Sequence, residues 1–173
     1  MVKLKLSGNK LTLFKHSSKG KNRTMKSLFD AIENQNIIKR IQKLSPSSTA
    51  QWGKMNVAQM LTHCQQPILV AYGELKLKRN FMGVLFGGMV KRMLLKEEIY
   101  KPGMPTAKQF IVTDQREFEK EKKLLIDLIQ RFSKQGPDGI RKDPHPFFGK
   151  LTAEEWDLMQ WKHLDHHLRQ FAA

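Results

Sequence analysis

The sequence feature that most restricts the possible folds of this chain is a long connection between two predicted helices. Residues 74–113, about 40 positions, show no sustained periodicity, and turn residues at 102–103 and 105 interrupt them. Connections of this length are uncommon in compact domains unless they cross between the ends of a bundle or insert a functional element. We expect a short helix over 83–95 and extended chain over 108–113 within this crossover.

Two helices are predicted before the connection. The first covers about 27–44 and ends at Ser45-Pro46, because a residue that precedes proline avoids the helical region. The second begins after Asn56, a good N-cap residue, and ends near Gly73. Pro67 lies inside this second helix and is expected to kink it.

Two further helices follow the connection. Asp114 and Glu117 have the spacing of a capping box, and apolar residues recur at helical spacing from there to Gly136-Pro137. Thr152 and Glu155 form a second capping box, which opens a helix to about Phe171. With no strand-like alternation, the pattern predicts an all-α fold, a four-helix bundle with a crossover between the second and third helices.

The composition is that of one domain with a core. The chain has 173 residues, of which 40% are hydrophobic, and a formal net charge of +15. No apolar run reaches the length of about 18 residues that a transmembrane helix needs. The single cysteine, Cys64, allows no internal disulfide and favours a reducing, cytoplasmic setting.

Much of the positive charge lies in two stretches. Residues 1–24 contain lysine and arginine but no acid, so we expect a basic, disordered extension before a folded domain at 25–173. A basic arm could bind nucleic acid or acidic lipid, and a start codon assigned too far upstream is an alternative. Residues 75–96 are also basic, with Phe81 and Phe86 interleaved, which fits either a nucleic-acid or membrane surface or a solvated face.

Histidines provide the strongest chemical signal. On a helical wheel centred on Trp156, His163 and His167 fall at about −20° and +20°, one turn apart within an apolar stripe. Two imidazoles at this spacing can bind one divalent metal. A third ligand should come from another helix, and His63 shares a face with Met60 on the second helix.

Three histidine ligands would leave a coordination position open, as in catalytic metal sites. Ligating nitrogens about 3–3.5 Å apart would fit one ion with bonds of ~2.0–2.1 Å. The alternative is that these histidines only pack in the core, since a histidine on an apolar face is usually a hydrogen-bonded core residue.

Several neighbouring residues allow two interpretations. Cys64 is either a reactive thiol or a small buried filler, and His166 is either a ligand or acid/base group or a surface or supporting residue. Asp165 is expected to be solvated. Gln170 could orient a ligand or form a polar edge of the packing. The tryptophans at 52, 156 and 161 either line a pocket or belong to an aromatic core.

Three motifs resemble the DinB/YfiT-like superfamily, in particular a branch defined as a domain of unknown function. The motifs are Trp52-Gly53-Lys54-Met55 with Met60-Leu61-Thr62-His63-Cys64, then His145-Pro146-Phe147-Phe148-Gly149, and Lys162-His163-Leu164-Asp165-His166-His167-Leu168-Arg169-Gln170-Phe171. The resemblance covers about 27–171. It implies a four-helix bundle in up-down-down-up order with a crossover after the second helix.

The same resemblance implies a function. Many members bind a divalent metal through one histidine of the second helix and an H-x-x-x-H pair of the last, which correspond here to His63, His163 and His167. It implies a metalloenzyme that holds zinc, nickel or iron and acts on a small-molecule substrate, either as a hydrolase or as a transferase with a low-molecular-weight thiol. Members are often homodimers, and the basic extension is outside the family pattern.

Two other functions remain open at the level of sequence. One is a non-catalytic basic module that binds nucleic acid or an acidic surface through residues 1–24 and 75–96. The other is a metal-free bundle whose histidines only pack. No glycine-rich phosphate loop, Ser/His/Asp pattern or CxxC motif supports a different enzyme class.

Overall fold

A computed structural model describes residues 26–78, 81–96, 98–104 and 106–173. These residues form five α-helices and two short 3-10 turns, 108–110 and 136–139, but no β-strand. The helices are α1 (Ala31–Gln42), α2 (Val57–Ala71), α3 (Phe81–Leu94), α4 (Phe118–Gln135) and α5 (Ala153–Gln170). The all-helical prediction is confirmed, and the short helix expected inside the long connection is α3.

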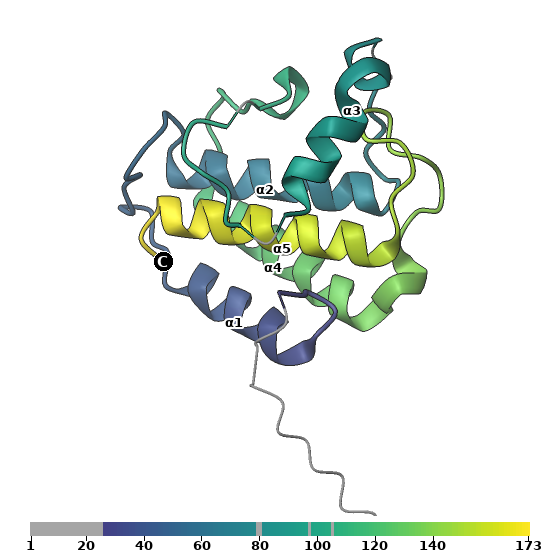
Figure 1. The fold of residues 1–173 in the computed structure, drawn as a ribbon. Coiled ribbons are helices and arrows are strands. Elements are labelled where there is room, and N and C mark those ends of the chain that lie inside the picture. Colours follow the sequence, from purple (N-terminus) through teal and green to yellow (C-terminus); the bar gives the residue numbers. More distant parts are fainter. Residues whose placement is uncertain (1–25, 79–80, 97, 105) are drawn as a thin grey trace, which may run out of the picture.

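Four of the helices pack against one another. Helix α2 packs on α4 and α5, and α1 packs on the same two helices. Figure 1 shows α3 and the connection that follows it on the side of α2 and α5 that lies away from α1. The crossover therefore covers one flank of the helical core, where α5 and α2 lie next to each other.

Two of the helix starts are fixed by reciprocal hydrogen bonds. The sequence predicts Asn56 as an N-cap residue and a capping box at Thr152, and the structure shows a capping box at both. Asn56 Oδ1 accepts from Gln59 N and Gln59 Oε1 accepts from Asn56 N, which satisfies two amides at the start of α2. Thr152 and Glu155 do the same for α5. Pro67 lies within α2, which continues through it to Ala71.

Two details of the crossover and of α4 differ from expectation. Helix α4 begins after Glu117 with no side-chain cap, because the Asp114 carboxylate pairs with Arg116 at 2.8 Å instead. The extended segment expected over 108–113 is instead a 3-10 turn from Lys108 to Phe110, and extended backbone follows only at Ile111. The predictions of a capping box at Asp114 and of a strand-like 108–113 were therefore wrong.

Buried polar contacts hold the start of α1 against the later helices. Asn34 Nδ2 donates to the carbonyls of Leu28 at 2.9 Å and Ile129 at 2.8 Å. The Asp157 carboxylate of α5 accepts from the Leu28 amide at 2.6 Å. These contacts surround a core of fully buried side chains, which includes Leu28, Ile37, Ile41, Met60, Leu61, Ile68, Leu125, Ile129, Phe132, Leu164 and Leu168.

Glycines allow α3 to approach the loop before α5 closely. A Cβ built on Gly87 would lie 1.7 Å from the Phe147 carbonyl oxygen, and one on Gly83 would lie 2.8 Å from Phe147 Cα. At the other end of α3, the Lys162 ammonium donates to the carbonyls of Leu94 at 2.7 Å and Lys96 at 2.6 Å. Lys162 thereby caps α3 and ties it to α5.

The predicted basic extension at 1–24 lies outside the described residues. Within those that are described, none of the helices combines the length and the apolar character that crossing a membrane requires.

Candidate metal centre

Three histidines from two helices meet at one point. His63 comes from the middle of α2, and His163 and His167 lie one turn apart on α5. One ring nitrogen of each lies within 4.8 Å of the others, and the Nε2 atoms of His63 and His163 are 3.0 Å apart. We call His63, His163 and His167 the histidine triad; they are the three residues that the sequence predicts as ligands.

A backbone carbonyl sets the orientation of His63. Its Nδ1 atom lies 2.9 Å from the carbonyl oxygen of Phe110, in the 3-10 turn of the crossover. A carbonyl oxygen can only accept, so Nδ1 carries the proton and the neutral ring keeps its Nε2 lone pair free. That lone pair faces the other two imidazoles.

A side-chain amide does the same for His167. Its Nδ1 atom lies 2.8 Å from Gln170 Oε1, and Gln170 Nε2 donates to the Trp52 carbonyl at 2.6 Å. The Trp52 contact fixes which end of the amide is oxygen, so His167 Nδ1 is the donor and its Nε2 lone pair is free. Gln170 therefore orients His167, one of the two roles considered for it.

The loop that holds Gln170 needs a glycine. Gly53 has φ of 84°, a left-handed conformation that favours glycine, and a Cβ at this position would lie 2.6 Å from Gln170 Nε2. The backbone of the loop also pairs with the end of α5, since Gln51 N donates to Gln170 O at 2.8 Å. Trp52 and Gly53 thus hold Gln170 in place, and Gln170 in turn orients His167 of the triad.

Burial keeps all three rings neutral at pH 7. It lowers the pKa of His63 and of His163, the latter strongly, and lowers the pKa of His167 to about 3, with the neighbouring imidazoles acting in the same direction. A neutral imidazole is the form that binds a metal. His63 and His163 are also close enough for one ion to bind both.

The donor set therefore fits a divalent cation. Two rings donate Nδ1–H to fixed oxygen acceptors and present Nε2 toward a common point, the arrangement by which supporting groups usually orient metal-binding histidines. The Nε2 atoms of His63 and His163 are 3.0 Å apart. Without an ion, one of them must carry a proton that it donates to the other, because two lone pairs at this distance repel each other. Nitrogen ligands of this kind suit zinc, nickel or iron.

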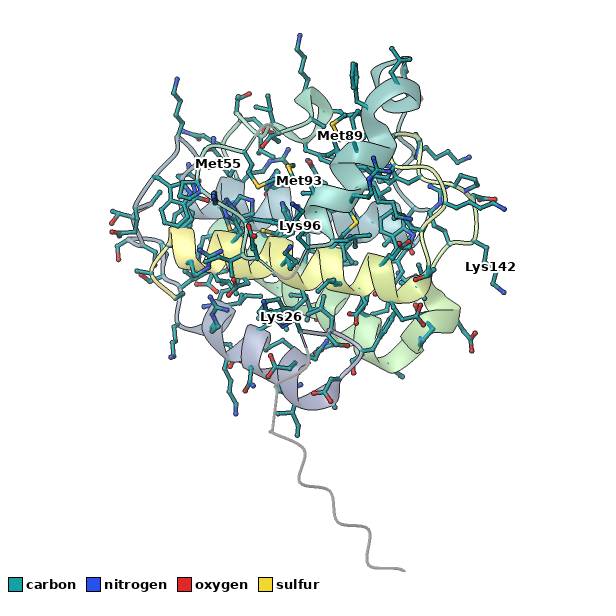
Figure 2. The ribbon with its side chains drawn as sticks, in the orientation of Figure 1. Lys26, Met55, Met89, Met93, Lys96 and Lys142 are labelled. Carbon is teal, nitrogen blue, oxygen red and sulfur yellow. The ribbon has the colours of Figure 1, made fainter. Side chains whose placement is uncertain are left out.

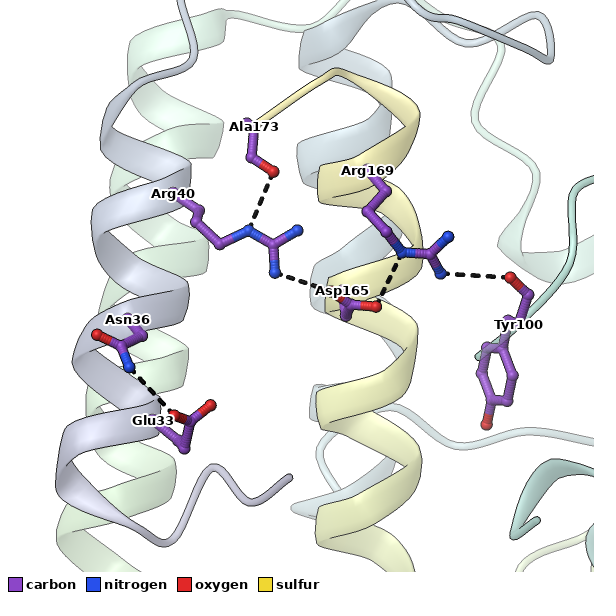
Figure 3. Close-up of polar contacts among 7 residues, drawn as sticks. All are labelled: Glu33, Asn36, Arg40, Tyr100, Asp165, Arg169 and Ala173. Carbon is purple, nitrogen blue, oxygen red and sulfur yellow. Dashed lines mark hydrogen bonds and ion pairs between the residues drawn. The ribbon is translucent and has the colours of Figure 1, made fainter. Parts of the chain in front are cut away.

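An ion-pair network braces the last turns of α5 (Figure 3). The Asp165 carboxylate bonds Arg40 of α1 at 2.8 Å and Arg169 at 2.9 Å. Arg169 also donates to the Tyr100 carbonyl at 3.3 Å, and Arg40 to the Ala173 carbonyl at 3.0 Å. Asp165 was expected to be solvated, but it is 8% exposed and joins α1, α5 and the crossover.

His166 and Cys64 do not belong to the group of side chains that could hold one ion. His166 Nδ1 lies 3.2 Å from the Tyr100 carbonyl, so this ring is attached to the crossover. Cys64 is buried beside Met60, and burial raises the pKa of its thiol. The interpretation of Cys64 as a small core residue is confirmed.

A cavity of about 210 Å³ adjoins the triad, and we call it the triad cavity. Helix α5 contributes one wall, α2 a second, and the crossover and the loop before α5 contribute the remaining lining residues. Of the tryptophans, Trp156 lines it. Its lining comprises His63, Pro67, Val70, Leu94, Tyr100, Met104, Thr106, Ala107, Phe110, His145, Phe148, Trp156, Met159, Gln160, His163, His166 and His167.

Sequence reasoning missed two parts of this site. The Phe110 carbonyl that orients His63 is a backbone group in an irregular segment, which no residue pattern reveals. Gln160 lies on the cavity side of α5, one turn from Trp156, and its position on the same wheel as the histidines was a signal that could have identified it.

Comparison with protein families finds one match: the family described as "Protein of unknown function (DUF1569)" matches residues 21–173. No curated protein and no solved structure matches the chain.

Proposed function

Because this chain belongs to the DUF1569 family, whose description names no activity, we propose a function from its own geometry: a divalent-metal-dependent enzyme that binds the ion through His63, His163 and His167. The observation that carries this proposal is the pair of oriented Nε2 lone pairs, on His63 and His167, directed toward the third ring. Burying three imidazoles together is unfavourable when no ligand is bound, because buried nitrogen lone pairs without a partner cost free energy.

The residues around the triad suit a reaction on a small molecule. When bound, the ion would supply a Lewis acid that polarises a substrate group or favours the anionic form of a thiol or water. Phe110 and Gln170 hold the rings, and a largely apolar cavity lies beside them. The chemistry is that of a hydrolase or of a transferase with a low-molecular-weight thiol.

The proposal extends to the fold. We place α1, α2, α4 and α5 as the four helices of a DinB-like bundle in up-down-down-up order, with α3 in the crossover. The mutual packing of these four helices and the position of the triad between α2 and α5 support this assignment.

Metal analysis of protein made without a metal-affinity tag tests the proposal. The protein is loaded with zinc or nickel, dialysed and measured by mass spectrometry, beside His63→Ala and His167→Ala. The matched control is His166→Gln, on the same helix but outside the triad. We expect one ion per chain in the wild type and the control, and much less in the triad variants. An empty wild type, or loss of metal only in His166→Gln, contradicts the proposal.

A second candidate function is a basic binding module. The exposed face of α3 carries Leu85, Met89 and Met93 at one-turn spacing, which are 57%, 61% and 49% exposed. Arg92 and Lys96 are also exposed, and Figure 2 shows Met89, Met93 and Lys96 along α3 and just beyond its end. Apolar side chains beside cations favour an acidic surface.

Sedimentation with acidic phospholipid vesicles tests this second candidate. Binding should weaken with added salt and with a Met89→Glu, Met93→Glu double variant, while metal content stays unchanged. Equal binding by the wild type and the double variant excludes α3 as the binding face.

A further inference from the structure

The three histidines of the triad differ in how their Nδ1 atoms are held. His63 Nδ1 donates to the Phe110 carbonyl at 2.9 Å, and His167 Nδ1 donates to Gln170 Oε1 at 2.8 Å. His163 Nδ1 is buried and has no hydrogen-bond partner among the described residues. Two of the three rings are therefore oriented by a fixed acceptor, and the third ring is not.

The other nitrogen of His163 sets the orientation of its ring. His163 Nε2 lies 3.0 Å from His63 Nε2, within hydrogen-bond distance. Turning the ring over would put a carbon atom in the place of Nε2 and would give up this bond. The observed orientation is thus the one that keeps the two rings hydrogen-bonded to each other.

This bond also determines where each ring carries its proton in the metal-free protein. The neutral ring of His63 has its proton on Nδ1, so its Nε2 atom can only accept. The donor must then be His163 Nε2, and a lone pair remains on His163 Nδ1. His163 is therefore the opposite tautomer to His63 and His167, and its proton lies on the nitrogen that faces His63.

Binding an ion through Nε2 would reverse the tautomer of His163. A ligating nitrogen must offer its lone pair, so the proton has to leave Nε2, and the neutral ring then carries a proton on Nδ1. No net proton is released, because solvent supplies one proton as it takes up the other. The new N–H is buried without an acceptor among the described residues, which costs free energy. His63 and His167 bind without this cost.

His163 also differs from the other two residues in burial. It is half-buried, whereas His63 is 3% and His167 is 7% exposed. A half-buried side chain can move away from an ion with less disturbance of the surrounding packing than a buried one. Hydrogen bonding and burial therefore single out the same ring as the one held least firmly.

We propose that His163 is the exchangeable ligand of the triad: His63 and His167 hold the divalent ion firmly, and His163 binds it weakly, through a change of tautomer. This inference rests on the proposed function, because it concerns the same ion. Catalytic metal sites keep a position that water or substrate can occupy. Release of His163 would give the ion a further such position beside the triad cavity, which His163 lines.

Heteronuclear NMR of the imidazole rings tests the change of tautomer, since it identifies which nitrogen of each ring carries the proton. Spectra are recorded on wild-type protein freed of metal with a chelator and again after zinc is added. The His163 signals are assigned by their loss in His163→Ala. We expect His63 and His167 to carry the proton on Nδ1 in both spectra, and His163 to change from Nε2 to Nδ1 when zinc binds.

Zinc affinity tests the unequal strength of the three ligands. Competition with a chromophoric chelator compares His63→Ala, His163→Ala and His167→Ala, and His166→Gln is the control on the same helix. We expect the losses in His63→Ala and His167→Ala to exceed the loss in His163→Ala by about tenfold or more, the lower end of what an orienting partner contributes to metal affinity. Thermal unfolding of the metal-free variants confirms that each one folds.

Either measurement can overturn the proposal. A proton on His163 Nδ1 in the metal-free protein, or one that stays on Nε2 after zinc has bound, contradicts the change of tautomer. Equal losses of affinity in the three alanine variants contradict the weak binding of His163. In these cases the wild type still binds zinc, so the proposed function stands. A wild type that binds no zinc contradicts the proposed function itself, and the two failures are thereby distinguished.

Discussion

His167 and Gln170 are joined on one turn of α5 by an Nδ1···Oε1 hydrogen bond of 2.8 Å, and Gln170 is itself held by the Trp52 carbonyl. The ring of a predicted ligand is thus oriented by a residue that is not a ligand. Removing such a supporting partner typically lowers metal affinity by roughly 10- to 100-fold.

Gln170→Leu should therefore weaken zinc binding by about 10- to 100-fold, less than loss of a triad histidine does. Competition with a chromophoric chelator measures the affinity. Gln130→Leu, on the exposed face of α4, controls for the change of side chain. Equal zinc affinity in Gln170→Leu and wild type would show that the His167–Gln170 bond has no part in metal binding.

Two neighbouring glycines of α3 should respond oppositely to alanine. At Gly87 the new Cβ would lie 1.7 Å from the Phe147 carbonyl, so α3 has to shift, at a cost on the order of 1–3 kcal/mol. At Gly88 nothing lies within 4 Å, and alanine favours the helix by about 1 kcal/mol over glycine.

Thermal unfolding distinguishes the pair. Gly88→Ala should raise Tm by roughly 2–4 °C, and Gly87→Ala should lower it. Similar shifts in both variants would mean that α3 does not dock closely on the loop at Phe147.

Acid should destabilise the protein partly through His145. Its Nδ1 accepts from the amides of Phe147 at 3.0 Å and Phe148 at 3.1 Å, so protonation at Nδ1 breaks both bonds. Burial, with Arg141 nearby, lowers the pKa of His145 from 6.5 to about 4.

The sign follows from proton uptake. Between pH 6.5 and about 4 the unfolded chain binds a proton at His145 that the folded chain does not, so stability is complete above pH 6.5 and falls as the pH decreases toward 4. His145→Asn keeps a side-chain acceptor for the turn and removes the titration. Denaturant unfolding at several pH values should give a shallower pH slope for this variant; a slope equal to that of the wild type contradicts the assignment.

The single thiol should be unreactive in the folded protein. Cys64 is 1% exposed and burial raises its pKa, so the thiolate is scarcely formed at neutral pH. An aromatic disulfide reagent should modify it only after denaturant is added. Rapid stoichiometric modification of the native protein would mean that the helices open around Cys64.

The sequence was sufficient for the features that depend on local patterns. Asn56 and Thr152 mark helix starts because a capping side chain serves amides only two or three residues away. His163 and His167 were paired by helical periodicity, which the geometry of α5 preserves. In each case the decisive contact lies within one or two turns of the same helix.

Long-range contacts limited the other predictions. Asp165 is far from the apolar stripe on a wheel, but α1 covers that side of α5 and brings Arg40 to it. Asp114 fits a capping box in sequence but pairs with Arg116, and α4 starts without it. Such outcomes depend on which helices become neighbours, and a single helix pattern does not contain that information.

The contacts that secure α1 determine when it can be completed during synthesis. Apart from the Leu28 carbonyl, the partners of Asn34 and Arg40 lie 95 to 133 residues later in the chain, on α4, on α5 and at Ala173. A chain that emerges from the ribosome N-terminus first has to expose the apolar face of α1 until α4 and then α5 have been made, and closing such long loops slows folding. Helix α1, the first helix among the described residues, is therefore among the last to be fully anchored.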